Sequence, residues 1–186
     1  MIRSKAVPTT RLSVIFRQAQ DNPIVGNSLK INQGCTNLTF TNTFCFIERS
    51  APEEILRTAC AFYVKAVKKF GLENVILLNP FRNKGLLSVN EFNRQLQNLI
   101  NPPTEEEESI KIRKLEFRPR DLVMQTKNTE IAMNGDIGVI HEISKMPDPD
   151  DMNRWTYIAS IEFNGDGKHH DYTPEMMQDL DLAYCT

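Results

Sequence analysis

The sequence of 186 residues lacks the apolar segments that would direct a chain into or across a membrane. No apolar run approaches the roughly 20 residues that a transmembrane helix needs. The N-terminus, which reads MIRSKAVPTTRLS, has no apolar signal region. These absences predict a cytoplasmic protein with no membrane partner.

Cysteine is scarce, and its spacing is unlike that of a metal or disulfide site. The four cysteines, Cys35, Cys45, Cys60 and Cys185, form no CxxC pair. Cys45 and Cys60 lie inside apolar patterns, where cysteine behaves as a small core residue. We therefore expect no metal site and no disulfide, as in other proteins of the reducing cytosol.

The common catalytic motifs are missing as well. The sequence contains no GxxxxGK[ST], no GxSxG, no HExxH and no GxGxxG. Its three histidines, His141, His169 and His170, lie in or beside predicted strands. We expect surface or edge positions for them rather than metal ligation. Composition and spacing alone therefore indicate a soluble α/β domain with a small β-barrel and assign it no reaction.

Charge is distributed unevenly along the chain. Residues 1–104 carry 13 Lys and Arg against 6 Asp and Glu, a net charge of +7. Residues 105–186 carry 9 against 18, a net charge of −9. This asymmetry favours two bodies, of which the first is better suited to meeting phosphate. The alternative is chance, together with the acidic run at 105–108.

Predicted helices and strands alternate over the first hundred residues. An Asx cap followed by proline predicts a helix start at 21–23, and capping boxes predict two more at 50–53 and 88–91. The β-branched and aromatic segment 39–48 and the apolar run 75–78 predict two strands, the second covered on both faces. This alternation is typical of a parallel α/β sheet with helices on both faces.

The helical period ends at Pro103, and short β-like runs follow an acidic linker. Turn signals separate these runs, which lie at 111–115, 121–128, 138–144 and 155–164. The segment Met146–Asp151 is predicted as a loop, and the apolar run 180–185 as one more buried strand. Short strands at this spacing predict a small barrel.

A basic stripe lies within the predicted barrel. Six Lys and Arg occur from Lys111 to Lys127, against only Glu116 and Asp121. Stripes of this kind are usually solvated surface, and nucleic-acid binding is the alternative.

Several segments, in the same order along the chain, carry the pattern of a known family. The pattern begins with LSVIFRQA at 12–19 and is strongest at DLVMQTKN, residues 121–128, and at NGDIG, residues 134–138. Further matches lie at 24–25, 31–34, 78–80, 85, 99–102 and 182–184. Together these segments resemble the RecD/TraA-type superfamily 1 DNA helicases, and the matches extend over nearly the whole chain.

The resemblance implies an α/β fold: a partial RecA-like parallel sheet with helices on both faces, interrupted by an inserted SH3-like β-barrel. Residues 1–107 would belong to the second RecA-like motor domain and residues 108–176 to the barrel. Residues 177–186 would form the return strand of the motor domain.

The resemblance also implies the function of a longer protein. The family's first motor domain, with its Walker A lysine and magnesium carboxylate, has no counterpart in the sequence, and the motif expected after Leu-Ala-Tyr-Cys-Thr would lie beyond Thr186. We therefore expect a fragment of an ATP-dependent DNA helicase of the exodeoxyribonuclease V alpha/RecD-like kind. Its implied partners are single-stranded DNA and the first RecA-like domain, and its cofactors are ATP and Mg²⁺. The fragment alone is expected to bind none of these cofactors and to be inactive.

The main alternative belongs to another class of protein. It is a non-enzymatic SH3-like module that binds a partner protein or nucleic acid. The two hypotheses differ in one feature of the parent reading frame: an upstream GxxxxGK[ST] would favour the helicase.

The resemblance assigns roles to a few side chains. Arg17 resembles the arginine that reaches the γ-phosphate of ATP across the cleft between the motor domains, and Gln18 is its companion. The alternative for Arg17 is a solvent-exposed arginine beside a helix cap. The candidate DNA contacts are Arg82, Lys84, Lys127 and Asn128. For Lys127 and Asn128, together with Gln125, packing between barrel and motor domain is the alternative.

In the longer helicase that the resemblance implies, Arg17→Ala should reduce ATP turnover by about 10³-fold or more, the scale of arginine fingers. The affinity for ATP should fall much less, because the phosphate-binding loop provides most ground-state binding. Arg17→Lys should restore little turnover, since a lysine keeps the charge but loses the two-pronged geometry. Steady-state ATPase assays test this prediction. Normal turnover in folded Arg17→Ala protein would support the alternative, a solvent-exposed arginine beside a helix cap.

Overall fold

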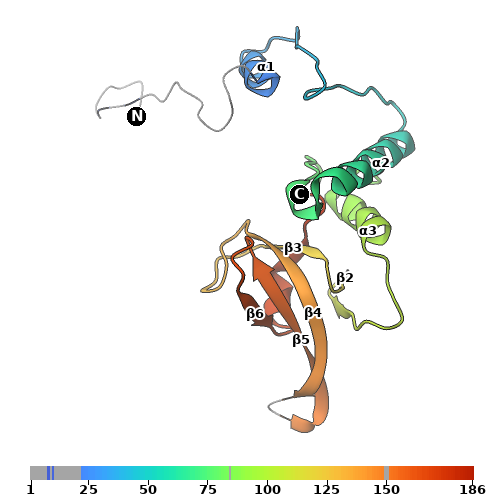
Figure 1. Ribbon diagram of the computed structural model, residues 1–186, viewed down its shortest axis with the longest axis vertical. Coiled ribbons are helices and arrows are strands. Elements are labelled where there is room, and N and C mark those ends of the chain that lie inside the picture. Colours follow the sequence, from blue (N-terminus) through green and yellow to red (C-terminus); the bar gives the residue numbers. More distant parts are fainter. Residues whose placement is uncertain (1–7, 9, 11–21, 84, 149–150) are drawn as a thin grey trace. The chain divides into compact units, whose positions relative to one another are not determined.

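The computed structural model describes residues 8, 10, 22–83, 85–148 and 151–186 (Figure 1). Three residues with predicted roles, Arg17, Gln18 and Lys84, lie outside the described residues. The chain divides into two compact units, residues 1–48 and residues 49–186, and each is described by itself.

The first unit contains the short helix α1, Pro23–Asn32. Its start matches the prediction, since the Asn22 side chain accepts a hydrogen bond from the backbone N–H of Ile24 at 3.0 Å and proline occupies the first turn. The strand predicted at 39–48 is wrong. Only one isolated bridge, between Thr41 and Phe44, forms there. β-Branched and aromatic residues favour a strand only where a neighbouring strand supplies packing, and no described strand lies beside this segment.

The second unit begins with two helices that pack against each other, α2 (Pro52–Phe70) and α3 (Val89–Ile100). Ser88 caps α3 as predicted, because its Oγ accepts a hydrogen bond from the N–H of Glu91 at 3.3 Å. The capping box predicted at 50–53 is wrong, since the N-cap is Ala51 and makes no side-chain bond. Proline at the first position and two glutamates in the first turn favour this helix start instead. No helix among the described residues is long and apolar enough to cross a membrane.

The apolar run at 75–78 forms less structure than predicted. A short 3₁₀ turn, η2 (Leu72–Asn74), precedes it, and a single parallel bridge joins Leu77 to Cys185. Ile76 and Leu78 are 52% and 74% exposed, so the predicted covering on both faces is wrong. Both sheets among the described residues are antiparallel, and a parallel RecA-like sheet is not observed. A parallel sheet needs covering layers on its faces, and the exposed Ile76 and Leu78 have none.

Strands follow the helices, as the sequence predicts, but two of them, β4 and β5, are longer than the predicted runs. β1 (Ile110–Ile112) and β2 (Leu115–Phe117) form a hairpin. A five-stranded antiparallel sheet has the order β6-β5-β4-β3-β7. Its strands are β3 (Leu122–Gln125), β4 (Ile137–Asp148), β5 (Asp151–Phe163), β6 (His169–Tyr172) and β7 (Leu180–Leu182). A 3₁₀ turn, η3 (Met176–Asp179), leads into β7.

The loop predicted at Met146–Asp151 is wrong, because the two long strands extend through most of it (Figure 1). Met146 pairs with Thr156 and Pro147 with Trp155. No third strand of the described residues lies beside this ribbon, since β6 pairs only with residues 159–162 of β5 and β3 only with residues 137–139 of β4. Proline is tolerated at such an unaccompanied position, where its missing N–H costs no ladder hydrogen bond.

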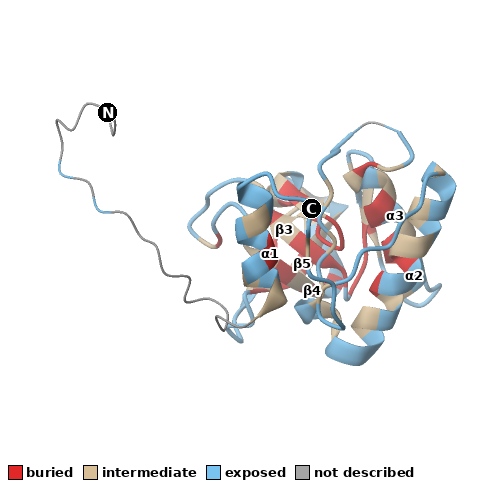
Figure 2. Ribbon diagram, turned by 90° about the horizontal axis from the view of Figure 1, so that it is seen from above, coloured by how far each residue is buried: buried red, intermediate tan, exposed pale blue. Residues whose placement is uncertain are grey.

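The core of the second unit is one cluster of buried residues from α2, α3, the β1–β2 hairpin, the five-stranded sheet and η3. On β5 the alternation predicted from the sequence is observed: Ala159, Ile161 and Phe163 are buried, and Figure 2 shows buried positions along this sheet and on the facing sides of α2 and α3. The run predicted as one strand at 180–185 divides between two pairings. β7 pairs with β3 in the antiparallel sheet, whereas Cys185 pairs in parallel with Leu77. The division into residues 1–107, 108–176 and 177–186 stays a prediction.

Close approach of β5 to β4 requires glycine at position 138. A Cβ there would lie 2.9 Å from the carbonyl oxygen of Glu162 and 2.9 Å from Cδ1 of Phe163. Gly138→Ala should therefore lower the free energy of unfolding by about 1–3 kcal/mol, the cost of overpacking a core. Urea denaturation measures this change.

The matched control is Gly26→Ala, in α1. A Cβ at Gly26 would meet no atom within 4 Å. Because alanine is the better helix former, by roughly 0.5–1 kcal/mol, this variant should be neutral or more stable. Unchanged stability in Gly138→Ala would contradict the close approach.

Candidate nucleic-acid interface

A buried carboxylate, Asp121, joins α3 to the sheet. Its Oδ1 accepts hydrogen bonds from Asn101 Nδ2 and from the hydroxyl of Tyr184, both at 2.7 Å. Its Oδ2 accepts from Gln97 Nε2 at 2.6 Å and from the backbone N–H of Arg118 at 2.8 Å. Each carboxylate oxygen therefore has two donors, which is what a buried charge requires.

Burial shifts the pKa values of Asp121 and Tyr184. It raises the pKa of Asp121 above the ordinary value of an aspartate, and the hydrogen bonds from Asn101 and Tyr184 partly offset the rise. Burial and then the neighbouring Asp121 charge raise the pKa of Tyr184. The Tyr184 hydroxyl therefore keeps its proton and acts as a donor to Asp121.

Further polar contacts extend the same junction. Asn93 Nδ2 donates to the carbonyls of Leu182 and Cys185, both at 2.9 Å, and Asn93 Oδ1 accepts from the N–H of Cys185 at 2.8 Å. Arg118 donates to the carbonyl of Asn101 at 2.9 Å and forms an ion pair with Glu116 at 3.0 Å. α3 is thus tied both to the β1–β2 hairpin and to the end of the chain.

The junction around Asp121 was not predicted from the sequence. Its signal was a row of amides on α3, since Asn93, Gln97 and Asn101 recur every four residues and so share one face of the helix. Polar residues at this spacing beside an apolar stripe indicate a buried polar contact. The partner Asp121 could not be identified without the tertiary structure.

A groove lies between α3 and the β1–β2 hairpin, with a volume of about 610 Å³. Carboxylates are few in its lining, which includes Glu91 and Glu116. We call it the basic groove, after its five cations: Arg94, Lys111, Arg113, Lys114 and Arg118.

The cations of the basic groove differ in their availability. Arg94 forms an ion pair with Glu91 at 2.6 Å, and Arg118 is buried against Glu116. Hydrogen bonding to Arg118 holds the pKa of Glu116 below its usual range. Lys111 and Lys114 are exposed, and Lys114 forms no ion pair with any described residue. Lys111 is the cross-strand partner of Glu116. Lys114 therefore supplies the positive charge of the groove that no described carboxylate pairs with, and such charge is suited to phosphate.

The structure brings one predicted DNA contact close to the basic groove. Arg82 forms an ion pair with Asp181, and the other oxygen of that carboxylate lies 3.5 Å from Arg113 of the groove. The Arg82 side chain is largely exposed, as a residue that binds phosphate must be.

The other predicted DNA-binding residues lie away from the groove lining. Lys127 forms an ion pair with Asp179 at 2.7 Å, and Asn128 Oδ1 accepts from the N–H of Asn134 at 2.8 Å. Gln125 is buried and accepts from the hydroxyl of Tyr172 at 3.1 Å. Their proposed roles stay predictions.

Comparison with known proteins gives two findings. Residues 92–155 match the family described as the ATP-dependent RecD-like DNA helicase SH3 domain. The chain is also similar to the ATP-dependent RecD2 DNA helicase of Deinococcus radiodurans, with 31% identity over 140 residues. The aligned region covers 74% of this chain but 18% of that relative, so the chain spans less than a fifth of the relative's length.

The matched SH3 segment covers the middle of the second unit. It begins within α3 and includes the β1–β2 hairpin, β3 and β4. Asp121 and both lysines of the basic groove fall inside it.

Replacing the buried carboxylate should destabilise the junction. In Asp121→Asn, an amide NH₂ replaces one carboxylate oxygen. It faces the two donors that bond to that oxygen in the wild type. The free energy of unfolding should fall by at least about 1–3 kcal/mol, the cost of leaving buried polar groups unpaired. Denaturant titration checks this, with the exposed Asp171→Asn as the control that makes the same chemical change. Equal stability of the two variants would contradict the role of Asp121.

The pH dependence has a definite sign. The folded-state pKa of Asp121 lies above the unfolded value of about 3.9. The contribution of Asp121 to the free energy of unfolding is therefore fully present below the unfolded-state pKa. It is lost as pH rises through the folded-state pKa. The stability difference between wild type and Asp121→Asn should shrink from pH 4 toward neutrality. A difference that grows over this range would show that hydrogen bonding outweighs burial.

Proposed function

Because the chain belongs to the RecD-type DNA helicase family, we propose that it forms part of an ATP-dependent DNA helicase. The longer protein would couple ATP hydrolysis to translocation on single-stranded DNA and to duplex unwinding. The supporting observation is the position of the basic groove, which lies in the segment that matches the SH3 domain of these helicases.

Within such a protein, the basic groove would bind the DNA backbone. Lys114 forms no ion pair with any described residue, and Lys111 is exposed although it lies opposite Glu116 in the hairpin. Exposed charge of this kind suits binding to phosphates of any sequence. Arg113 and Arg82 share Asp181, so both guanidinium groups are held at the same edge of the fold. Phosphates could compete with this one carboxylate for two cations.

The buried junction would make both walls of the groove move together. α3 supplies one wall and the β1–β2 hairpin the other, and Gln97 donates to both Asp121 and the carbonyl of Glu116. A displacement of the DNA-bound hairpin would therefore reach α3 directly. From α3 it would reach Cys185 through Asn93, and then Leu77 through the parallel bridge.

ATP and Mg²⁺ would be bound by the longer protein. The sequence has no GxxxxGK[ST] loop, and one arginine such as Arg17 does not hold MgATP by itself. We therefore propose that this chain alone has no ATPase activity. DNA-stimulated ATP hydrolysis by the purified chain would contradict that proposal.

DNA binding by the purified chain tests the role of the basic groove. Fluorescence anisotropy with a labelled oligothymidylate should show that Lys111→Ala/Lys114→Ala weakens binding. Each phosphate of a single strand that a cation neutralises contributes about 0.7 to the slope of log affinity against log salt. Removing both lysines should therefore make that slope shallower by about 1.4.

The control variant is Lys65→Ala/Lys68→Ala, which changes net charge equally. These two lysines lie on α2, are exposed and do not line the basic groove. Binding and its salt dependence should stay close to wild type. Equal weakening by both double variants would favour diffuse attraction, and no DNA binding by the wild type would favour the alternative of a protein-binding module.

A further inference from the structure

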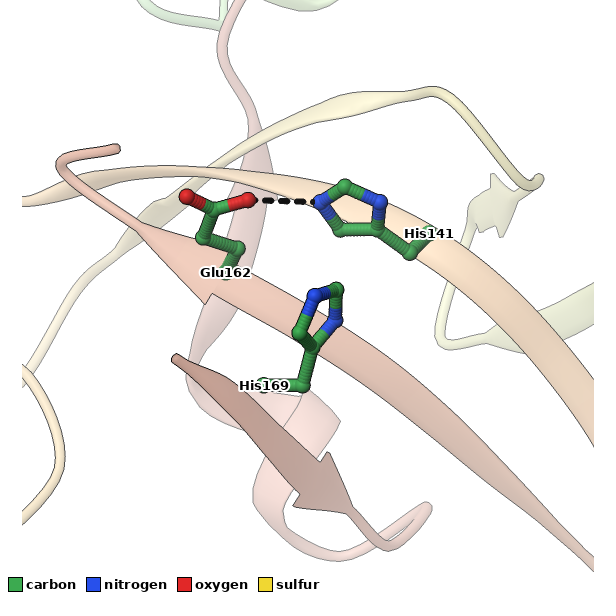
Figure 3. Close-up of side chains that lie close together, drawn as sticks. All are labelled: His141, Glu162 and His169. Atoms are coloured by element: carbon green, nitrogen blue, oxygen red, sulfur yellow. Dashed lines mark hydrogen bonds and ion pairs between the residues drawn. The ribbon is translucent and has the colours of Figure 1, made fainter. Parts of the chain in front are cut away.

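Three potential metal ligands converge on one face of the five-stranded sheet, away from the basic groove. His141 lies on β4, Glu162 on β5 and His169 on β6 (Figure 3). These three strands are neighbours in the sheet. Side chains at matching positions on adjacent strands therefore meet, although they are far apart in sequence.

Strand pairing places two of the three side chains directly opposite each other. Glu162 and His169 are cross-strand partners between β5 and β6. Residues that pair in this way project from the same face of the sheet. The imidazole of His169 therefore projects beside the carboxylate of Glu162.

Strand alternation brings in the third side chain. Val139 on β4 pairs with Glu162, and His141, two residues further along, projects from the same face of the sheet. The register shifts just beyond this point, since Ile140 pairs with Ile161 and Glu142 with Ser160. His141 is the extra residue of this β-bulge and has no cross-strand partner of its own.

The ligand atoms are already close together. His141 Nε2 lies 2.9 Å from Glu162 Oε2, and the two imidazole rings are 4.4 Å apart between centroids. One ligand atom from each of the three residues lies within 4.8 Å of the others. Bonds of about 2.0–2.2 Å to a shared ion would need only small side-chain rotations.

Additional hydrogen-bonding contacts orient two of the three ligands, Glu162 and His169. Glu162 Oε1 accepts a hydrogen bond from the backbone N–H of Gly167 at 2.9 Å, which leaves Oε2 directed toward His141. His169 Nδ1 lies 3.4 Å from the hydroxyl of Ser160. Outer partners of this kind fix ligand orientation in metal sites. The Gly167 contact depends on a backbone φ of +73°, which favours glycine at that position.

From this geometry we propose that His141, Glu162 and His169 bind a Zn²⁺ ion. Two imidazoles and one carboxylate form a ligand set that zinc accepts with a fourth position open. Hard cations such as Mg²⁺ and Ca²⁺ prefer oxygen ligands, and only one of the three residues supplies oxygen. The sequence correctly predicts surface positions for the histidines but does not show that strand pairing brings two of them to one carboxylate.

Open space adjoins the ligands. His141 and Glu162 line a hollow of about 630 Å³, which is also lined by Glu73 of η2. Water can occupy the fourth position from this side. The zinc ion would join β4, β5 and β6, and it would therefore stabilise the sheet as any ligand that binds only the folded state does.

Zinc titration of the full 186-residue chain tests the site. Isothermal titration with ZnCl₂ should use a Cys35→Ser/Cys45→Ser background, because both of these thiols are exposed and free and thiolates also bind zinc. One Zn²⁺ should bind per chain and raise the melting temperature, whereas MgCl₂ should do neither. Removing an outer partner alone typically costs about 10–100-fold in metal affinity, so His169→Ala or Glu162→Gln should cost at least about tenfold.

His170→Ala is the matched control. His170 is adjacent to His169 but pairs with the buried Ile161, and successive residues of a strand face opposite sides. Zinc affinity should be unchanged in this variant. A second measurement needs no substitution of a ligand: NMR of the wild-type chain should show zinc-dependent shifts of the His141 and His169 ring signals but not of His170.

Two outcomes would overturn the proposal. One is the absence of stoichiometric zinc binding in the Cys35→Ser/Cys45→Ser background. The other is zinc binding that His141→Ala, Glu162→Gln and His170→Ala weaken equally, since that would indicate unspecific surface binding. If either occurs, the contact between His141 and Glu162 is an ion pair without a metal.

Discussion

The buried carboxylate of Asp121 constrains the whole second unit. An ionised side chain in a protein interior is strongly unfavourable unless every lone pair meets a donor. Here the donors come from three separate parts of the chain: α3, the turn before β3, and Tyr184 near the C-terminus. None of these segments can move without leaving the charge unpaired. The relative position of α3 and the sheet is therefore fixed by polar contacts, in addition to the apolar core.

This constraint also explains why a groove persists beside α3. Helix and hairpin meet through amide and carboxylate contacts around Asp121, and Gln97 and Arg118 extend those contacts to Glu116 on β2. The cations Lys111 and Lys114 then lie on the outer side of a rigid support. Rigid presentation of charge reduces the conformational entropy that is given up when a phosphate chain binds.

Local features of the chain could be predicted from its sequence, whereas features that depend on a distant partner could not. The cap of α3 at Ser88 and the buried alternation at Ala159, Ile161 and Phe163 follow from spacing alone. The segment 39–48 has high β-propensity but no adjacent strand, and the segment around Pro147 is paired despite its loop-like composition. The site residues show the same limit. The convergence of Asp121 with Tyr184, or of His141 with His169, requires a strand order and register that no sequence pattern specifies.

The junction around Asp121 gives a structural reason for the sequence resemblance to RecD-type helicases. Three matched segments supply Asn101, Asp121 and Tyr184, and the structure joins these residues by direct hydrogen bonds. Lys111, Arg113 and Lys114 lie inside the SH3 match at residues 92–155 but outside these short motifs. A buried network tolerates few substitutions, because each change leaves a donor or acceptor unpaired. Binding to a uniform phosphate backbone needs only positive charge in roughly the right place. The motifs therefore mark the support that holds α3 to the sheet, and the surface that would meet DNA has to be found from the geometry of the groove.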